Sequence, residues 1–208
     1  MPGKHVHFSE DVHFPPTPSP SYTVTSLPSS YGPVTPPQNT YLPMTGMPAI
    51  HPVLEFTGCA PPLSFDVTLP VQNVKPSTNI FSPNILYENA TAPAVASLVI
   101  THPRLLWDIT IRPSEGKCVR VCDVLSGIYT SLRQQASGTD YESLPSHTAK
   151  SEVTAAFARR WMRIPDPAAK SVEKSKGLKR VDFLGSTVTF GGLSRSQSGP
   201  NYWNLVLA

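Results

Sequence analysis

The sequence predicts an α+β domain, with a mostly antiparallel sheet and two helices packed on one face, preceded by a disordered proline-rich arm. The arm is predicted because residues 1–50 contain eleven of the 24 prolines and three charged side chains. The domain is predicted because short alternating apolar runs, typical of strands, lie on both sides of two segments with helical periodicity. Strands, then helices, then strands is an order typical of α+β folds rather than of βαβ folds.

Residues 1–48 are the predicted arm. Ser, Thr and Pro dominate it, so it has too little apolar surface to offset the entropy lost on folding. The run from Pro15 to Pro20 favours the polyproline II conformation. The remaining residues, 49–208, are expected to form a single α+β domain, a length that buries about two-thirds of its unfolded surface.

Four strands are predicted in the first half of this domain. Leu63–Leu69 alternates apolar and polar residues and ends at Pro70. Ser97–Thr101 and Trp107–Ile111 follow, and Val119 with Val121 indicates a short fourth strand. Residues 71–92 between them are predicted to form a long loop.

Two helices are predicted next. Asp123 is a suitable N-cap for a helix that carries Val124, Leu125, Ile128 and Leu132 at helical spacing and ends at Ser137-Gly138. A second helix is expected from Ser146 to Met162, ended by the prolines at 165 and 167. A lysine-bearing loop is expected to follow it.

The segment Gly177–Leu193 is predicted to form a β-hairpin around which the domain is organised. Val181 and Phe183 alternate in its first half, Val188 and Phe190 alternate in its second, and Gly185-Ser186 between them is a turn signal. Trp203, Leu205 and Leu207 predict a final strand.

The composition favours a protein of the cytoplasm or nucleus that is not secreted. The net charge is +3, the first residues lack the apolar run of a secretory signal, and no stretch reaches the roughly 18 apolar residues of a membrane span. Three cysteines, an odd number, favour free thiols in a reducing compartment.

Positive charge is concentrated between Arg159 and Arg180, where eight Lys or Arg residues accompany Asp166 and Glu173. Such a region can bind phosphate groups of nucleic acid or lipid. It contains one aromatic residue, Trp161, and it is split by prolines, so a solvated basic loop is the alternative and nucleic acid is not the preferred partner. The candidate phosphate-binding residues are Arg159, Arg160, Arg163, Lys174, Lys176, Lys179 and Arg180.

The arm carries candidate contacts to a protein partner. Its anchors, predicted to add as a strand to a sheet edge, are Lys4, Val6, Phe8, Val12 and Phe14. The segment from Lys4 to Phe8 also resembles the basic-x-Val-x-Phe docking peptide of protein phosphatase-1 partners. Ser-Pro and Thr-Pro pairs that fit proline-directed phosphorylation begin at Thr17, Ser19, Thr35 and Ser82.

No catalytic residue, cofactor or metal site is predicted. The sequence lacks a Gly-x-Ser-x-Gly elbow and a glycine-rich phosphate loop. Cys118 with Cys122 could bind a metal, but buried or surface thiols are the simpler interpretation. The histidines of the arm, His5, His7 and His13, could also chelate a metal, with a solvated tail as the alternative.

Short segments along residues 51–208 resemble an uncharacterised fungal domain family, common in mushroom-forming basidiomycetes and of unknown function. Leu106 departs from the family, whose members often carry proline there. The arm also resembles the Pro/Ser-rich tails that precede this domain. The resemblance implies lineage and fold, and no catalytic residue is transferred by it. The segments that carry it are His51–Leu54, Phe65–Val67, Trp107–Ile109, Asp123–Leu125, Arg159-Arg160, Gly177–Gly185, Phe190–Leu193 and Trp203–Leu205.

Three function hypotheses follow from the sequence. The first is a non-enzymatic intracellular interaction or regulatory protein whose tail carries docking and phosphorylation motifs. The second is a small-molecule binder or hydrolase with a pocket between helices and sheet. The third is a phosphate binder that uses the basic region 159–180.

Overall fold

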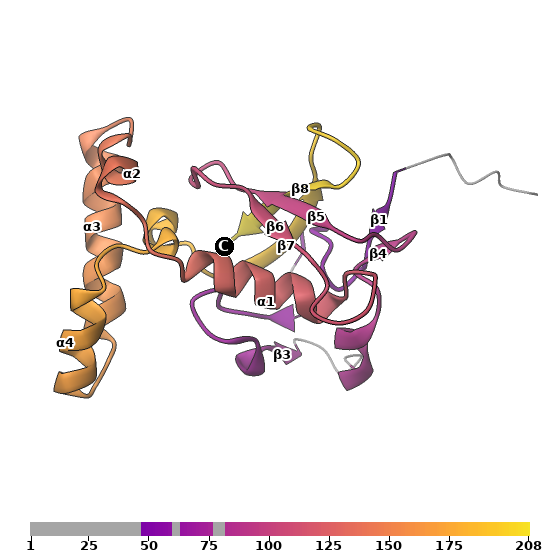
Figure 1. Cartoon of the computed structure of the whole chain (residues 1–208), viewed down its shortest axis with the longest axis horizontal. Coiled ribbons are helices and arrows are strands. Elements are labelled where there is room, and N and C mark those ends of the chain that lie inside the picture. Colours follow the sequence, from indigo (N-terminus) through magenta and orange to yellow (C-terminus); the bar gives the residue numbers. More distant parts are fainter. Residues whose placement is uncertain (1–46, 60–62, 77–81) are drawn as a thin grey trace, which may run out of the picture. The chain divides into compact units, whose positions relative to one another are not determined.

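A computed structural model describes residues 47–59, 63–76 and 82–208, all of which lie within one compact unit, 42–208 (Figure 1). The described residues combine helices with strands, so the α+β class predicted from the sequence is confirmed. The arm anchors, the arm histidines and the three Thr/Ser-Pro pairs between Thr17 and Pro36 lie outside the described residues.

The main sheet has four strands in the order β6-β5-β8-β7. β5 (Leu98–Thr101) pairs antiparallel with β6 (Ile109–Ile111) and parallel with β8 (Tyr202–Leu207). β7 (Phe190–Arg195) pairs antiparallel with β8. The predicted strands near 97–101, 107–111 and 203–207 are therefore confirmed, whereas the parallel β5–β8 pair makes the sheet mixed.

Short two-residue ladders surround this sheet. β1 (Ala49–Ile50) pairs with β4 (Thr91–Ala92), and β2 (Leu63–Ser64) pairs with β3 (Lys75–Pro76). The predicted strand 63–69 is regular over its first two residues, but Leu63, Phe65 and Val67 are buried in alternation as expected. The segment around Phe65 lies against the outer edge of β7, because the amide of Phe190 donates to the carbonyl oxygen of Phe65 at 2.8 Å.

Helix α1 (Val121–Leu132) packs on the sheet through Val124, Leu125 and Ile128. It begins two residues before the predicted N-cap, so Val121 is helical and no strand forms there. Asp123 is instead the third helical residue, and its carboxylate accepts the amide of Arg120 at 2.8 Å. Asp123 therefore caps the helix from inside its first turn.

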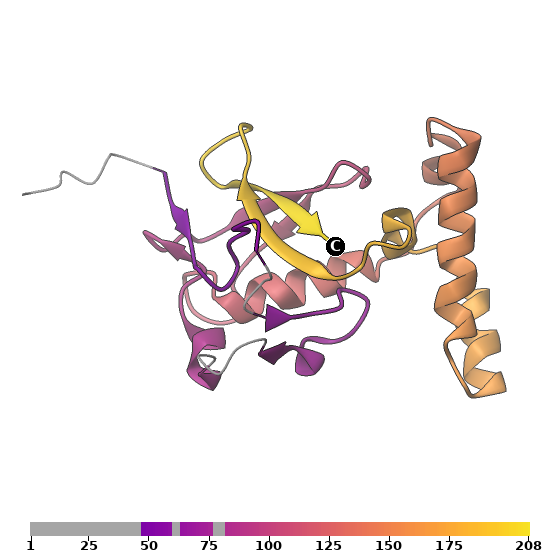
Figure 2. The same ribbon diagram turned by 180° about the vertical axis from the view of Figure 1, so that it is seen from behind.

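The sequence predicts two helices, and the described residues contain four (Figures 1 and 2). α2 (Gly138–Glu142) and α4 (Pro167–Ser175) are the additional ones. α4 replaces the predicted lysine-bearing loop, because Asp166 caps the amide of Ala169 at 2.8 Å and a proline occupies the first helical position. α3 (His147–Met162) has the predicted bounds, with Ser146 as its N-cap.

The predicted hairpin 177–193 is wrong in its first half. Residues Arg180–Leu184 form a 3₁₀ helix, η3, and only the second half becomes a strand, β7. Val181, Asp182, Phe183 and Leu184 are all buried, whereas a strand with one solvent-facing side would bury alternate residues. Gly185, with a φ of 73°, ends the 3₁₀ helix.

Two further 3₁₀ helices, η1 (Val71–Asn73) and η2 (Pro83–Tyr87), lie in the predicted loop 71–92 and contact α1. Helix α3 packs against η3, and α4 packs against α3. There Phe183 meets Val153 in a second small core, and its ring lies edge-on to Trp107 at 5.1 Å. No helix in the described parts of the chain has the length and apolar character needed to cross a bilayer.

Candidate functional site

Four charged side chains meet where α3, α4 and η3 come together, and we call them the buried ion cluster: Arg160, Glu173, Lys179 and Asp182. Arg160 donates Nε to Asp182 Oδ1 at 2.8 Å and Nη2 to Oδ2 at 2.9 Å, which is a bidentate pair. Its Nη1 donates to Glu173 at 2.5 Å, and Lys179 Nζ donates to the same carboxylate. The cluster therefore connects three elements, and Arg160 Nη2 adds a bond to the Gly177 carbonyl oxygen at 2.8 Å.

The cluster is enclosed by the fold. The exposed fraction of the side chain is 1% for Asp182, 7% for Glu173 and Lys179, and 11% for Arg160. Asp182 also accepts the backbone amide of Lys179 at 2.8 Å, which starts η3. Buried charges require this degree of pairing, since an unpaired one is strongly unfavourable.

The pKa shifts in the cluster follow from burial and pairing. Burial opposes the negative charge of Glu173, but hydrogen bonds from Lys179 and Lys176 lower its pKa to about 2. Burial also opposes the charge of Arg160, yet the hydrogen bonds and charge of Asp182 raise its pKa. Burial lowers the pKa of Lys179 in spite of its bond to Glu173. Glu173 and Arg160 are thus held in their charged forms.

The lowered pKa of Glu173 predicts an acid-sensitive fold. Its carboxyl titrates at 4.5 ordinarily and at about 2 in the folded protein, so its pairing stabilises the domain fully above pH 4.5. That contribution, about 3 kcal/mol, is lost as the pH falls from 4.5 to 2. Urea unfolding measured across this range should show the free-energy difference between the wild type and Glu173→Gln shrinking as the pH falls.

The exposed carboxyl of Glu115 provides the control for this titration, since Glu115→Gln removes a carboxyl whose side chain is 81% exposed. Its free energy of unfolding should parallel that of the wild type over the whole range. A difference between the wild type and Glu173→Gln that stays constant from pH 6 to pH 2 would contradict the assignment.

A pocket of about 480 Å³ opens beside the buried ion cluster, and we call it the arginine pocket. Four arginines line it together with two carboxylates, so its lining carries a net charge of +2. The charged lining residues are Arg133, Arg159, Arg160, Arg163, Glu173 and Asp182, and the others are Thr68, Leu69, Ala156, Ile164, Pro165, Val181, Gly185, Ser186 and Val188.

The two carboxylates of the arginine pocket are already paired, whereas three of its arginines retain positive charge for a ligand. Glu173 and Asp182 belong to the buried ion cluster, which uses Arg160. Arg159 and Arg163 are exposed and form no ion pair with any described residue. Arg133 lies 3.9 Å from Glu173, at the limit of an ion pair. Excess positive charge therefore remains at the mouth of the pocket.

The structure divides the predicted phosphate-binding set. Arg159, Arg160 and Arg163 line the arginine pocket. Arg160 also belongs to the buried ion cluster, together with Lys179. Lys176 pairs with Glu173 at 3.2 Å. Lys174 and Arg180 point elsewhere, since Lys174 lies over the Trp161 ring at 5.0 Å and Arg180 over the Trp107 ring at 4.7 Å.

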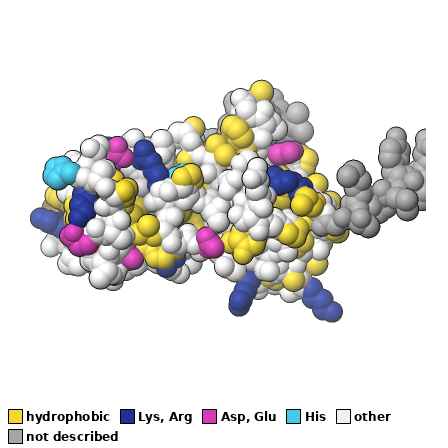
Figure 3. Space-filling view, turned by 90° about the horizontal axis from the view of Figure 1, so that it is seen from above, with side chains coloured by type: hydrophobic (Ala, Val, Ile, Leu, Met, Phe, Trp, Pro, Cys, Tyr) yellow, Lys and Arg dark blue, Asp and Glu magenta, His cyan; other side chains and the backbone are white. Residues whose placement is uncertain are grey.

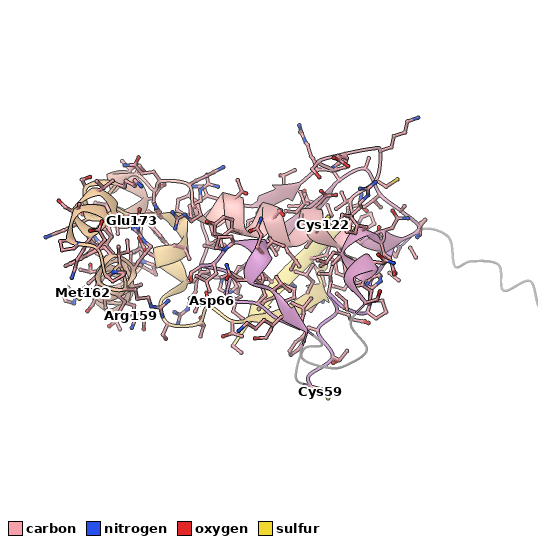
Figure 4. The ribbon with its side chains drawn as sticks, turned by 90° about the horizontal axis from the view of Figure 1, so that it is seen from below. Cys59, Asp66, Cys122, Arg159, Met162 and Glu173 are labelled. Atoms are coloured by element: carbon pink, nitrogen blue, oxygen red, sulfur yellow. The ribbon has the colours of Figure 1, made fainter. Side chains whose placement is uncertain are left out.

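Arg133 is the member of the pocket that the sequence interpretation missed. It lies 26 positions before Arg159, and it is the C-cap residue directly after α1. A basic residue at the end of a helix is favoured by the helix dipole, and no local sequence signal places Arg133 near Arg159. Figure 4 shows Arg159, Met162 and Glu173 gathered at the same end of the molecule, away from Cys122.

Cys59, Cys118 and Cys122 are free thiols, and burial raises the pKa of Cys122. Within the described ranges, no three His, Cys, Asp or Glu side chains are placed to hold a metal ion.

The comparisons with known proteins give one family. The profile of a family described as a family of unknown function (DUF6699) matches residues 63–200 of this chain. Neither the curated proteins nor the solved structures contain a match. The matched residues include every described helix and the arginine pocket, with the segment before residue 63 outside the match.

Proposed function

The chain belongs to the DUF6699 family of unknown function, and we propose that it is a non-enzymatic interaction protein that binds an acidic or phosphorylated segment of a partner protein in the arginine pocket. The observation that carries this proposal is the convergence of Arg133, Arg159 and Arg163 around a pocket whose own carboxylates are already paired. A guanidinium group binds carboxylate and phosphate oxygens through two parallel hydrogen bonds, which suits it to such a ligand.

The walls of the pocket favour a peptide over a nucleic acid. Leu69, Ile164 and Pro165 supply apolar surface next to the arginines, and Leu69 is 43% exposed. An apolar side chain beside a phosphate or carboxylate group would cover these residues. None of the described residues that line the pocket is aromatic, so none of them would stack on a base.

The distribution of charged side chains also favours a peptide over a nucleic acid. On the face in Figure 3, Lys and Arg side chains are scattered among Asp and Glu rather than gathered into one broad patch. Trp161, the aromatic residue of the basic region, is covered by Lys170 and Lys174 at 5.4 and 5.0 Å. On that face, the charged side chains form no continuous positive track of the kind that follows a phosphate backbone.

Fluorescence polarisation tests this proposal with three labelled, degenerate peptide mixtures that differ at one fixed position. The first mixture carries phosphoserine, the second glutamate and the third serine. The phosphoserine or glutamate mixture should bind more tightly than the serine mixture, and the Arg159→Glu, Arg163→Glu double variant should weaken that binding at least about tenfold. Lys117→Glu, which makes a charge change at an exposed residue outside the arginine pocket, should leave it unchanged.

Two results would overturn the proposal. One is equal binding of the three mixtures, and the other is unchanged binding by the double variant. A labelled single-stranded RNA and vesicles with an anionic lipid serve as competitors. Displacement of the peptide by either at lower concentration than by unlabelled phosphopeptide would assign the pocket to that class of ligand instead.

Several finer expectations from the sequence belong to this proposal. The protein is proposed to be of fungal, mainly basidiomycete, origin and to act in the cytoplasm or nucleus, on the strength of its motifs and its three cysteines. The division into an arm, 1–48, and a domain, 49–208, is part of the same proposal. The arm residues Lys4, Val6, Phe8, Val12 and Phe14 would supply additional contacts to the partner.

A further inference from the structure

Strand β6 is an edge of the main sheet, and its outward-facing backbone groups can be identified. The amide of Val99 in β5 donates to Asn201 at 2.9 Å, so the backbone of Val99 faces β8. Its neighbours Leu98 and Ile100 therefore face β6, where they pair with Ile111 and Ile109. By the same alternation, the N–H and C=O groups of Thr110 point away from the sheet, and no described residue bonds to them.

The sequence of this edge is complementary to itself. It reads Asp108-Ile109-Thr110-Ile111-Arg112, with opposite charges equally spaced about Thr110. If a second copy pairs antiparallel about Thr110, Asp108 lies opposite Arg112 of the partner subunit at both ends of the ladder. Opposite charges placed directly across an antiparallel pair stabilise it.

The side chains at this edge are available for such a pairing. Asp108, Thr110 and Arg112 are exposed, and neither charged residue forms an ion pair with another described residue. Ile109 and Ile111 are buried on the opposite face of the strand. Pro113 lacks an N–H group, which limits the ladder to this short segment.

The flank of α1 leaves room for a neighbouring strand. A groove of about 520 Å³ lies between β6 and α1, and the small side chains of Cys122, Ser126 and Thr130 line it. Gly127 brings α1 close to the sheet, because a Cβ atom there would lie 2.4 Å from the Ile111 Cδ1 atom. The α1 side of the groove therefore carries only small side chains, and Gln134, after α1, and Arg180, in η3, are the larger side chains that also line it.

We propose that β6 pairs with β6 of a second copy of this chain, joining two four-stranded sheets into one across a two-fold axis at Thr110. The axis is perpendicular to the sheet, so both α1 helices lie on the same face. A protected edge commonly carries a charge that repels another strand. Here the two charges are opposite and symmetrically placed, and the surface is isologous, as a two-fold dimer requires.

Sedimentation velocity on the full chain tests this dimer, with charge reversals at the edge. Asp108→Arg or Arg112→Asp turns two opposite-charge pairs into two like-charge pairs, and each should raise the dimer dissociation constant about tenfold or more. The double variant Asp108→Arg, Arg112→Asp restores complementarity and should return the constant to within about threefold of the wild type. Lys117→Glu should not change it.

Circular dichroism establishes that each variant is folded, as expected for exposed positions. A wild-type chain that stays monomeric up to about 1 mM would overturn the proposal. So would a dimer that the single reversals leave unchanged, since its interface would lie elsewhere, or a double variant no tighter than the single ones. None of these measurements depends on the arginine pocket.

Discussion

Replacing Arg160 with methionine is expected to lower the free energy of unfolding by about 3–5 kcal/mol, because it leaves Asp182 as a buried charge without its bidentate partner and removes one of the cations paired with Glu173. Methionine keeps much of the volume of the arginine side chain, so the loss reports charge rather than a cavity. Urea unfolding at pH 7 measures it. The change should also weaken the attachment of α3 to η3, where Phe183 packs.

Arg159→Met is the matched control for this substitution. Arg159 is the preceding residue on α3, it is exposed, and it forms no ion pair within the described part of the chain. Its replacement should change stability by less than about 0.5 kcal/mol. Adding Asp182→Asn to Arg160→Met should recover part of the loss, since the orphaned charge of Asp182 disappears. Equal stability of Arg160→Met and Arg159→Met would show that the buried ion cluster contributes nothing.

Replacing Gly192 with alanine is expected to destabilise the protein by about 2–4 kcal/mol. Gly192 lies at the bulge in β7 with a φ of 130°, a backbone conformation that residues with a side chain rarely adopt. A Cβ atom there would lie 2.7 Å from both the N and the Cα of Phe56. The atoms that would have to move belong to the backbone of Phe56, so a change of side-chain rotamer cannot relieve the strain.

Gly138→Ala is the control for the glycine substitution. Gly138 is the first residue of α2, and nothing lies within 4 Å of its missing Cβ. Alanine should be neutral or stabilising there, because it favours the helix and reduces the entropy of the unfolded chain. Thermal unfolding of both variants compares them directly. A Gly192→Ala protein as stable as Gly138→Ala would contradict the close approach of residue 56 to β7.

Elements with strong local signals could be predicted from the sequence. The apolar spacing from Val124 to Leu132 predicted α1, and Ser146 with the prolines after Met162 predicted α3 to within one residue. The strands β5, β6 and β8 alternate clearly. The pairing of β5 with β8 could not be predicted, since it joins residues about 100 positions apart and local pattern carries no information about it.

The hairpin prediction failed for a physical reason that the sequence does not display. Val181 and Phe183 alternate with polar neighbours as in a strand, but the neighbour Asp182 is buried by its bond to Arg160. Apolar alternation indicates a strand only when the polar residues face water. Arg160 was assigned to a phosphate site because the sequence does not show that it pairs with Asp182, which lies 22 positions away. The segment that forms α4 was predicted to be a loop because of its lysines, although Asp166-Pro167 is a helix-start signal.

The position of β8 inside the sheet has a consequence for synthesis. Tyr202–Leu207 lies between β5 and β7, and it is the last strand of the described chain to be translated. Until these residues leave the ribosome, β5 and β7 have no common neighbour, and apolar side chains such as Leu98 and Phe190 stay accessible to other molecules. The nascent chain is therefore expected to need protection by chaperones until Tyr202–Leu207 has left the ribosome.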